Sequence, residues 1–576
     1  MKKTGAWLVR FALEQIGVKY TFGIPGVHNT EIYDELNKSG LIQPVLVTHE
    51  GGGAFMADAI GRTSDQIGTL LIVPAAGVTH ASSGIGEAFL DGIPMLVIAG
   101  GIRTDTGKTY QLHEMDQHAL LAPITKKTYK IETHEQIIPA IYEAYEIATR
   151  GEPGPVFVEV PVNLQLFPGA VSQTPPFVAV NPEYPLDREA IQQAAQMLYE
   201  ATSPGLFLGW GAVDASDETV RIAEFLGAPV ATTLQGLSSF PANNALHTGM
   251  GFGPAAVPAA ENAFKKCDCL LAVGTRFGEI ATASYGVNPP QNMIHVDINK
   301  DVFNANYPAA ISIEGDAKTA MAELLKSLHT IGAPKPDNAG LIAAIRSDKA
   351  AYQNEWLKHD SKDRVNPARF FTQLRKQLDD DAIVVADDGN HTFLVAELMP
   401  IHRARGFISP TDFNCMGYCT PAVTAVKLVN PDKQVVGIIG DGAFLMTCME
   451  TLTASSLELG GVFFVFNDGE LSQISQAQEI PYNRKTCTVL HELKLKGIAD
   501  ATGCEFITME NDTDCEDVIQ KALSHAAQNK PVIVDVKIDY SKRTRFTKGI
   551  VKTNLERFTV ANKARFIGRA LLRKML

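Results

Sequence analysis

The sequence predicts an α/β protein with three doubly wound parallel-sheet domains and a basic C-terminal tail. Short runs rich in valine and isoleucine alternate with helical patterns along the whole chain, as in parallel sheets covered by helices. A chain of 576 residues is too long for one hydrophobic core and corresponds to about three domains. The composition, with 45% hydrophobic and 20% charged residues, argues against a disordered or membrane-spanning chain.

Stretches rich in proline and polar residues mark the domain boundaries. The first spans 168–185, the second spans 333–338, and a new domain begins near Arg364. We therefore expect an N-terminal domain, a central domain, a C-terminal domain and a tail at 1–170, 186–335, 360–541 and 542–576.

The N-terminus begins with two lysines after Met1, like a secretion signal. Arg10 and Glu14 interrupt any apolar stretch, so we expect an amphipathic first helix instead. All eight cysteines lie after residue 266 and lack the paired spacing of a zinc site. This pattern is typical of buried thiols in a reducing compartment and predicts a cytoplasmic protein.

A glutamate opens a glycine-rich segment in the first domain. The short apolar run Pro44 to Val47 leads into His49-Glu50-Gly51, and a helix is expected from Gly52 to Gly61. A glutamate at this place can cap the helix, or it can share a proton with a ligand in a water-poor cleft. The residues alone favour the cap.

The third domain contains a glycine turn with an aspartate, Gly440-Asp441-Gly442. It follows an apolar strand at 434–439 and precedes a helix expected at 443–457. A helix N-terminus after a glycine turn favours an anion. Asp468 follows the next apolar strand, 27 residues after Asp441, and Mg²⁺ takes a few hard oxygen ligands together with phosphate oxygens. The spacing predicts a magnesium-bound diphosphate, with an ordinary strand-to-helix turn as the alternative.

This spacing resembles the motif of thiamine diphosphate (ThDP) enzymes of the acetolactate synthase, pyruvate oxidase and pyruvate decarboxylase superfamily, and most of all acetolactate synthases. The family motif ends in Asn-Asn, whereas Asp468 replaces the second Asn here. The resemblance implies that Asp441, Asp468 and the backbone carbonyl of Glu470 bind Mg²⁺. The added charge of Asp468 is expected to raise the Mg²⁺ requirement or to weaken cofactor binding. Further cofactor contacts are implied for Gly440, Gly442, Ala443 and Ile474.

The segment from His49 to Ala57 resembles the His-Glu-x-x-Ala-x-x-Met-Ala segment of acetolactate synthases. In that family the glutamate donates a hydrogen bond to the aminopyrimidine ring of ThDP, which lets the cofactor remove its own thiazolium proton. The resemblance therefore implies that Glu50 is catalytic rather than a helix cap.

Two more segments of the third domain resemble cofactor contacts of the family. Met416-Gly417-Tyr418 is similar to the element whose apolar side chain props ThDP in its bent shape, so Met416 takes that role, with ordinary core packing as the alternative. Asp388-Gly389-Asn390-His391 is similar to the family's Gly-Gln-His diphosphate contact, with a surface turn as the alternative. The implied contacts are Gly389, Asn390 and His391.

The segment after the magnesium motif indicates the reaction. Pyruvate decarboxylases carry a glutamate there that assists aldehyde release, whereas the segment Leu471 to Ile474 has no acid. The resemblance thus implies decarboxylation of a 2-oxo acid followed by addition to a second carbonyl. His28 and His113 are candidates to orient substrate or transfer protons, and Gln111 competes with His113 for its place. Cyclohexane-1,2-dione hydrolase, a relative, has histidines near these places, so cleavage of a cyclic diketone stays open.

A flavin site in the central domain is also implied. Acetolactate synthases and pyruvate oxidases hold FAD there, and Gly209-Trp210-Gly211, Thr232-Thr233-Leu234 and Arg276 resemble parts of that site. The family's second arginine is replaced by Ile280. The sequence favours FAD only slightly.

The tail differs in charge from the rest of the chain. The protein carries a net charge of −13, yet residues 542–576 contain eleven Lys and Arg against one acid, Glu556. A helix over 555–576 gathers apolar side chains on one face. Such a tail can lie on an anionic membrane, as in bacterial pyruvate oxidase, or fold over its own body or a neighbouring subunit, which we favour. The acidic body argues against nucleic-acid binding. The apolar face of the helix expected over 555–576 consists of Phe558, Phe566, Ile567, Ala570, Leu571 and Met575.

The resemblance also implies an oligomer, because in such enzymes the catalytic glutamate of one subunit meets the diphosphate site of another. We expect at least a homodimer, and commonly a homotetramer. Two other functions stay open: a flavin-linked 2-oxo acid oxidase that docks to membranes through its tail, and a catalytically silent ThDP-fold protein that regulates a partner.

Overall fold

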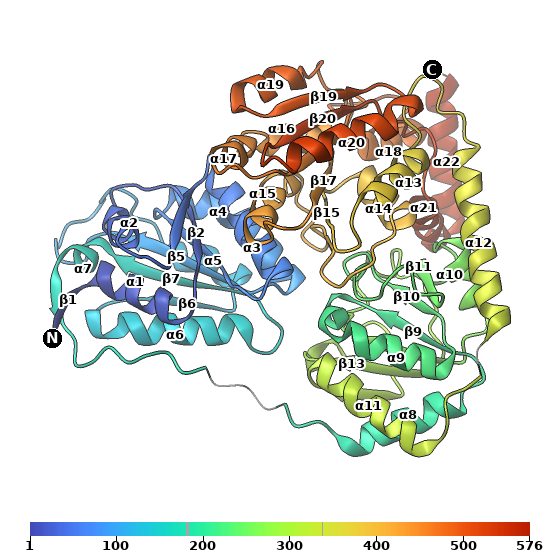
Figure 1. Cartoon of the computed structure of the whole chain (residues 1–576), viewed down its shortest axis with the longest axis horizontal. Coiled ribbons are helices and arrows are strands. Elements are labelled where there is room, and N and C mark those ends of the chain that lie inside the picture. The colour runs from blue at the N-terminus through green and yellow to red at the C-terminus, as the bar shows by residue number, and fades with distance from the viewer. Residues whose placement is uncertain (180–183, 337, 576) are drawn as a thin grey trace.

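The computed structural model describes residues 1–179, 184–336 and 338–575, so parts of both predicted linkers and Leu576 lie outside it. Three six-stranded parallel sheets follow one another along the chain, which confirms the predicted α/β class. Figure 1 shows the first domain at the left, the third domain at the upper right and the central domain below the third. Helix α12 (Ala339–Leu357) connects the central and third domains.

The first sheet is buried on both faces, as its continuous apolar strands require. Helices α1 (Gly5–Gln15) and α6 (His134–Thr149) pack together on one face. Helices α3 (Glu50–Thr63) and α4 (Ala76–Asp91) pack together and share a core with the third domain. The strand order is β3 (Gln43–Leu46), β2 (Tyr20–Gly23), β4 (Gly68–Ile72), β5 (Met95–Gly101), β7 (Pro155–Pro161) and β6 (Lys127–Lys130).

The predicted end of the first domain near residue 170 coincides with a small antiparallel sheet. Strand β1 (Lys2–Thr4) pairs there with β8 (Pro168–Ala170), which joins the two ends of the domain. The first helix forms as expected, and its half-buried Arg10 pairs with Glu14 and Glu35.

The third domain repeats the topology of the first. Its helix α15 (Cys419–Val429) packs along α3 and joins the cores of the two domains. The Phe55 ring meets the Tyr418 ring edge-on at 5.5 Å in this joint core. The strand order is β16 (Phe407–Ile408), β15 (Ile383–Ala386), β17 (Val435–Gly440), β18 (Val462–Phe466), β20 (Val532–Val536) and β19 (Glu505–Met509).

The helix predicted at 443–457 is wrong in its extent, because two short helices occupy this region. They are α16 (Asp441–Thr447) and α17 (Glu450–Ser456). Glu450 at the start of α17 accepts hydrogen bonds from the backbone N–H groups of Thr48 and His49, at 3.0 and 3.1 Å. This contact to the first domain fixes where the second helix begins.

The central sheet has the strand order 3-2-1-4-5-6, which is typical of dinucleotide-binding folds. Its faces are covered by helices such as α8 (Arg188–Glu200) and α11 (Ala317–Ile331), which pack against each other. The strands in this order are β11 (His247–Met250), β10 (Val230–Thr232), β9 (Pro204–Leu208), β12 (Cys269–Val273), β13 (Asn292–Asp297) and β14 (Ile311–Glu314).

The tail forms two helices rather than the single helix predicted over 555–576. Helix α21 (Arg545–Arg557) ends at Phe558, whose extended backbone starts a new direction, and α22 (Val560–Met575) follows. Helix α21 lies against the central domain, where Arg557 stacks on Tyr285.

Helix α22 packs against α18 (Ser472–Tyr482), and Arg573 donates a 2.6 Å hydrogen bond to the carbonyl of Pro481. Of the predicted apolar face, Phe558, Ile567 and Leu571 are exposed, and the side chain of Met575 lies outside the described residues. In the part of the chain that the structure describes, no helix has the length and apolar character needed to cross a membrane.

All eight cysteines are free thiols. The expectation that they are buried holds for Cys269, Cys419 and Cys515, whereas Cys487 is exposed and the remaining four are half-buried. Cys487 is exposed because it lies in the polar segment that follows α18, outside the cores of the three domains.

A buried ionic cluster joins the first and third domains. Arg62 is fully buried and pairs with Asp58 at 2.6 Å and with Asp91 at 2.9 Å. Glu87 accepts hydrogen bonds from the backbone N–H groups of Thr411 and Cys415. Burial, reinforced by the charge of Asp91, raises the pKa of Glu87 to about 9.

Substitution Glu87→Gln is expected to reduce the decrease in folding stability that the parent shows between about pH 5 and pH 9. The raised pKa means that the folded chain keeps a proton which the unfolded chain releases near pH 4.5, so stability falls as the pH rises through this window. Thermal midpoints of the variant and the parent between pH 5 and 9 measure the effect, with the exposed Glu132→Gln as control. Parallel curves for parent and variant would contradict the raised pKa.

Candidate active site

The turn after β17 and the loop after β18 meet at the carboxyl edge of the third sheet, where ligands bind in such folds. Asp441 accepts hydrogen bonds from the N–H groups of Gly442 and Gly469, one on each carboxylate oxygen, both at 2.8 Å. Burial raises the pKa of Asp441. The two segments that carry the predicted magnesium ligands are therefore tied together.

Asp468 supplies a buried oxygen with no protein partner in the described chain. This oxygen is Oδ1, whereas Oδ2 accepts a hydrogen bond from the Ser472 hydroxyl. Burial, together with the charge of Asp441, raises the pKa of Asp468 to about 6. Burial disfavours the charged form of both carboxylates, and a divalent cation between them would stabilise that form. The side chain of Glu470 pairs with Lys485 at 2.6 Å, which leaves its carbonyl for the predicted role.

His391 supplies a second unsatisfied buried atom beside the same turn. Its Nε2 has no partner among the described residues, and burial lowers the pKa of the ring to about 3, so the imidazole is neutral. The ring packs on Gly440, where a Cβ would lie 3.0 Å from the His391 Cε1 atom. Gly389 precedes α14 (Asn390–Leu398), which begins with Asn390 and His391. A neutral ring nitrogen at this place fits a diphosphate contact.

Met416 is half-buried against the core shared by α3 and α15. The next residue, Gly417, has φ +87° and donates a 2.8 Å hydrogen bond to Asp387, whose pKa burial raises to about 7. The backbone at Met416 is thus fixed. Its packing is compatible both with the cofactor role and with an ordinary core role.

The predicted contacts around Gly442 are only partly brought together. Ala443 is buried in the shared core, whereas Ile474 is 51% exposed on α18. Leu471 contacts Gly442 instead, since a Cβ at Gly442 would lie 2.3 Å from the Leu471 Cδ2 atom. Leu471 was missed as a contact because its distance from the turn is decided by the fold of the loop after β18.

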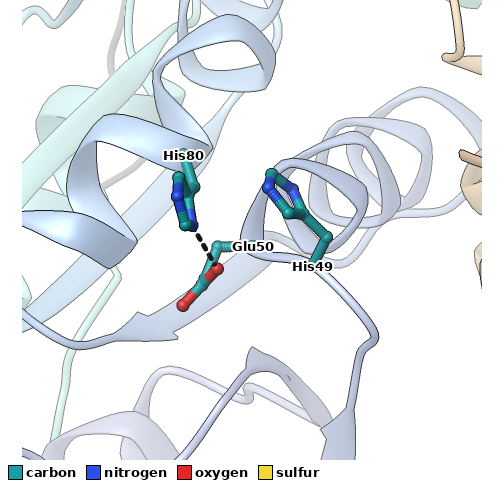
Figure 2. A group of neighbouring side chains, drawn as sticks. All are labelled: His49, Glu50 and His80. Atoms are coloured by element: carbon teal, nitrogen blue, oxygen red, sulfur yellow. Dashed lines mark hydrogen bonds and ion pairs between the residues drawn. The ribbon is translucent and has the colours of Figure 1, made fainter. Parts of the chain in front are cut away.

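Glu50 is the first residue of α3 and is 6% exposed. The residue that caps the helix is His49, whose Nδ1 accepts a 3.0 Å hydrogen bond from the Gly51 N–H. Glu50 is consequently free of the capping role, and its Oε2 lies 2.9 Å from Nδ1 of His80 on α4 (Figure 2). Its other oxygen lies beside Gly77, where a Cβ would be 3.4 Å away. Sequence reasoning missed His80, because no local pattern links it to Glu50 across 30 positions.

His28 and His113 face each other although 85 positions separate them. Their rings lie 4.9 Å apart, and the Nδ1 atoms of both are buried without a partner in the described residues. Burial, and then the neighbouring His113, lowers the pKa of His28. Gln111, the competing candidate, donates instead to the carbonyls of Arg103 and Lys108 in its own loop. The structure therefore pairs His113, and not Gln111, with His28.

Three family models match the chain in succession. They cover residues 2–120 as a thiamine pyrophosphate enzyme N-terminal TPP binding domain, 191–324 as the central domain and 387–536 as the C-terminal TPP binding domain. The acetolactate synthase large subunit of Haemophilus influenzae is 30% identical over 554 residues, covering 94% of this chain and 96% of that protein. The chain belongs to the thiamine diphosphate enzymes.

Other acetolactate synthases are similar over the same length. The probable large subunit of Methanocaldococcus jannaschii is 30% identical over 567 residues, covering 93% of this chain and 92% of that protein. The isozyme 3 large subunit of Escherichia coli is 29% identical over 558 residues, covering 94% and 95%. The expected family is confirmed, and the buried oxygens and ring nitrogen described above fit ThDP and Mg²⁺.

The central domain of this ThDP enzyme has a cleft at the carboxyl edge of its sheet. One part of about 810 Å³ is lined by Trp210, Gly211 and Asp297, and a smaller part includes Thr233, Leu234 and Arg276. All predicted flavin residues except the buried Thr232 thus line one continuous region, and the strand order suits a dinucleotide.

The charges of this cleft do not suit a flavin dinucleotide. Among the described lining residues the cations are Arg276 and Arg405, and both are paired: Arg276 with Glu152 and Asp412, and Arg405 with Asp214. The N–H of Gly211 donates to the carbonyl of Gly274 rather than facing a phosphate. The shape of the cleft fits FAD, but its charged side chains do not, so no catalytic step is assigned to a flavin.

Proposed function

We propose that this enzyme decarboxylates a pyruvate-like 2-oxo acid and transfers the remaining acyl unit to a second carbonyl compound, as acetolactate synthases do. The observation that carries the proposal is the absence of a free acid from the segment that directly follows the candidate cation site. The nearest acid, Glu470, is held by Lys485 and Ser475, and no acid occurs from Leu471 to Gln478. Without a proton donor there, addition to a carbonyl is favoured over aldehyde release.

The roles of the protein groups follow from their positions. ThDP, when bound, would supply the carbon nucleophile and the electron sink for decarboxylation. Asp441 and Asp468 would hold the cation that neutralises the diphosphate, and His391 lies at the same turn. Glu50 would share a proton with the cofactor ring from a buried position.

The same proposal includes a homodimer or homotetramer. Glu50 is held by His80 and, through the backbone before it, by Glu450, whereas Asp441 and Asp468 are held by loops of the third domain. Helices α16 and α17 expose an apolar patch next to Glu450, which suits a second copy. The patch consists of Leu445, Met446, Met449 and Leu452.

The test is product analysis by NMR of the purified enzyme with pyruvate, ThDP and Mg²⁺, with and without aldehydes or other 2-oxo acids. Acetolactate or mixed 2-hydroxy ketones that disappear in Glu50→Gln would support the carboligase. Acetate formed only with an electron acceptor would indicate the oxidase. The paired arginines of the central cleft and the docking of the tail on α18 favour the carboligase over that alternative.

A second candidate, hydrolysis of a cyclic 1,2-diketone, is favoured by the His28 and His113 pair. Two facing imidazoles with unpartnered nitrogens suit the binding of two adjacent carbonyl oxygens. Cleavage of cyclohexane-1,2-dione that is lost in His113→Ala, without turnover of pyruvate, would establish it. If neither 2-oxo acids nor cyclic 1,2-diketones are turned over, the remaining alternative is the catalytically silent protein.

A further inference from the structure

The contact between Glu50 and His80 links a buried carboxylate to a half-exposed imidazole. The side chain of Glu50 is 8% exposed and that of His80 is 48% exposed, and Oε2 lies 2.9 Å from Nδ1. When Glu50 is ionised it can only accept, so Nδ1 of His80 carries the proton and Nε2 is left as a base. A carboxylate that orients a histidine in this way is a recurrent arrangement for moving protons.

The surroundings hold the His80 ring in place. The His49 ring stacks on it at 4.5 Å with an angle of 27° between the planes (Figure 2). His49 is itself fixed by its hydrogen bond from Gly51 and by the contact of its backbone with Glu450. Tyr33 donates to the carbonyl of Leu71 and so does not compete for Glu50.

The three side chains would also suit a divalent cation, since ligand atoms of His49, Glu50 and His80 all lie within 4.8 Å of one another. Both Nδ1 atoms, however, are engaged in hydrogen bonds within the protein, one with Gly51 and one with Glu50. A cation bound through these Nδ1 atoms would have to break both contacts, whereas proton transfer uses the Glu50 contact as it stands.

We propose that His80 is the proton partner of Glu50 and carries protons between this buried carboxylate and solvent. The inference rests on the proposed role of Glu50 toward ThDP. In the outward step the Glu50 carboxyl gives its proton to Nδ1 of His80 as Nε2 gives its own to water or to a substrate oxygen. The imidazole stays neutral and no electrons are exchanged with another group. His80 is thus a positioning and relay residue for Glu50.

The test compares His80→Asn with His80→Ala in the full-length holoenzyme. The amide nitrogen of asparagine can take the place of Nδ1 and still donate to Glu50, but it cannot relay a proton. The readout is the rate at which the C2 proton of bound ThDP exchanges with deuterium, measured by acid quench and proton NMR without substrate. Both variants are expected to exchange about 10²-fold more slowly than the parent. Added imidazole should restore exchange in His80→Ala.

The matched control is His402→Asn, because His402 makes a similar 2.8 Å contact with Asp380 in another part of the fold. Its exchange rate should equal that of the parent. If His80→Asn exchanges like the parent, His80 acts only as a hydrogen-bond donor and the proposal is overturned. If Glu50→Gln exchanges like the parent, the proposed role of Glu50 itself fails. Should His80→Ala fail to fold, His80→Asn decides alone, with ThDP binding measured by calorimetry to verify the fold.

Discussion

Substitution Glu50→Gln is expected to lower kcat by about 10²–10⁴-fold while ThDP still binds. Glutamine keeps the size of the side chain and can still meet His80, so the start of α3 is preserved. It lacks the titratable proton that the cofactor ring needs. Steady-state kinetics with the substrate found by product analysis measure the loss, and calorimetry measures ThDP affinity.

The exposed Glu132→Gln serves as a control for general effects of removing a carboxylate, and its kcat should match the parent. An unchanged kcat in Glu50→Gln would remove Glu50 from the chemistry. A parent protein with no reaction above background would instead favour the catalytically silent protein.

The second large effect concerns the cation site. Substitution Asp441→Asn is expected to weaken ThDP binding by about 10²-fold at fixed Mg²⁺, since a hydrogen bond to a charged group contributes about 1.5–3 kcal/mol. One oxygen of Asp441 accepts from Gly442 and the other from Gly469. An amide can satisfy only one of these N–H groups, and it removes the charge that attracts the cation. Titration with ThDP followed by calorimetry at several Mg²⁺ concentrations measures the loss.

Asp468→Asn is the informative partner of this variant, because it restores the residue type of the family motif. The amide oxygen can still bind a cation, and the charge beside the diphosphate is removed. We expect ThDP affinity at low Mg²⁺ to be retained or improved. An equal loss of affinity in Asp468→Asn and Asp441→Asn would contradict the view that Asp468 raises the Mg²⁺ requirement.

The features predicted from the sequence are those encoded by local patterns. Apolar runs followed by glycine and aspartate place Asp441 and Asp468 at strand ends, and parallel strands bring their ends to one edge of the sheet. The three-domain α/β fold follows from the same alternation. The glutamate at position 50 could be proposed as catalytic only through the resemblance, because the local pattern alone favours a helix cap.

Tertiary packing decided the rest, because it joins residues whose separation in the chain carries no periodic signal. His80 meets Glu50 across 30 positions, and Glu450 meets Thr48 across 402, which also divides the helix predicted at 443–457. Likewise, only the fold pairs His113 with His28 and joins Arg276 to Asp412 in the central cleft. The sequence by itself determined the class of cofactor, because its motifs resemble those of ThDP enzymes and lie in backbone turns at strand ends. Which side chains share a proton or neutralise a charge depended on packing between domains.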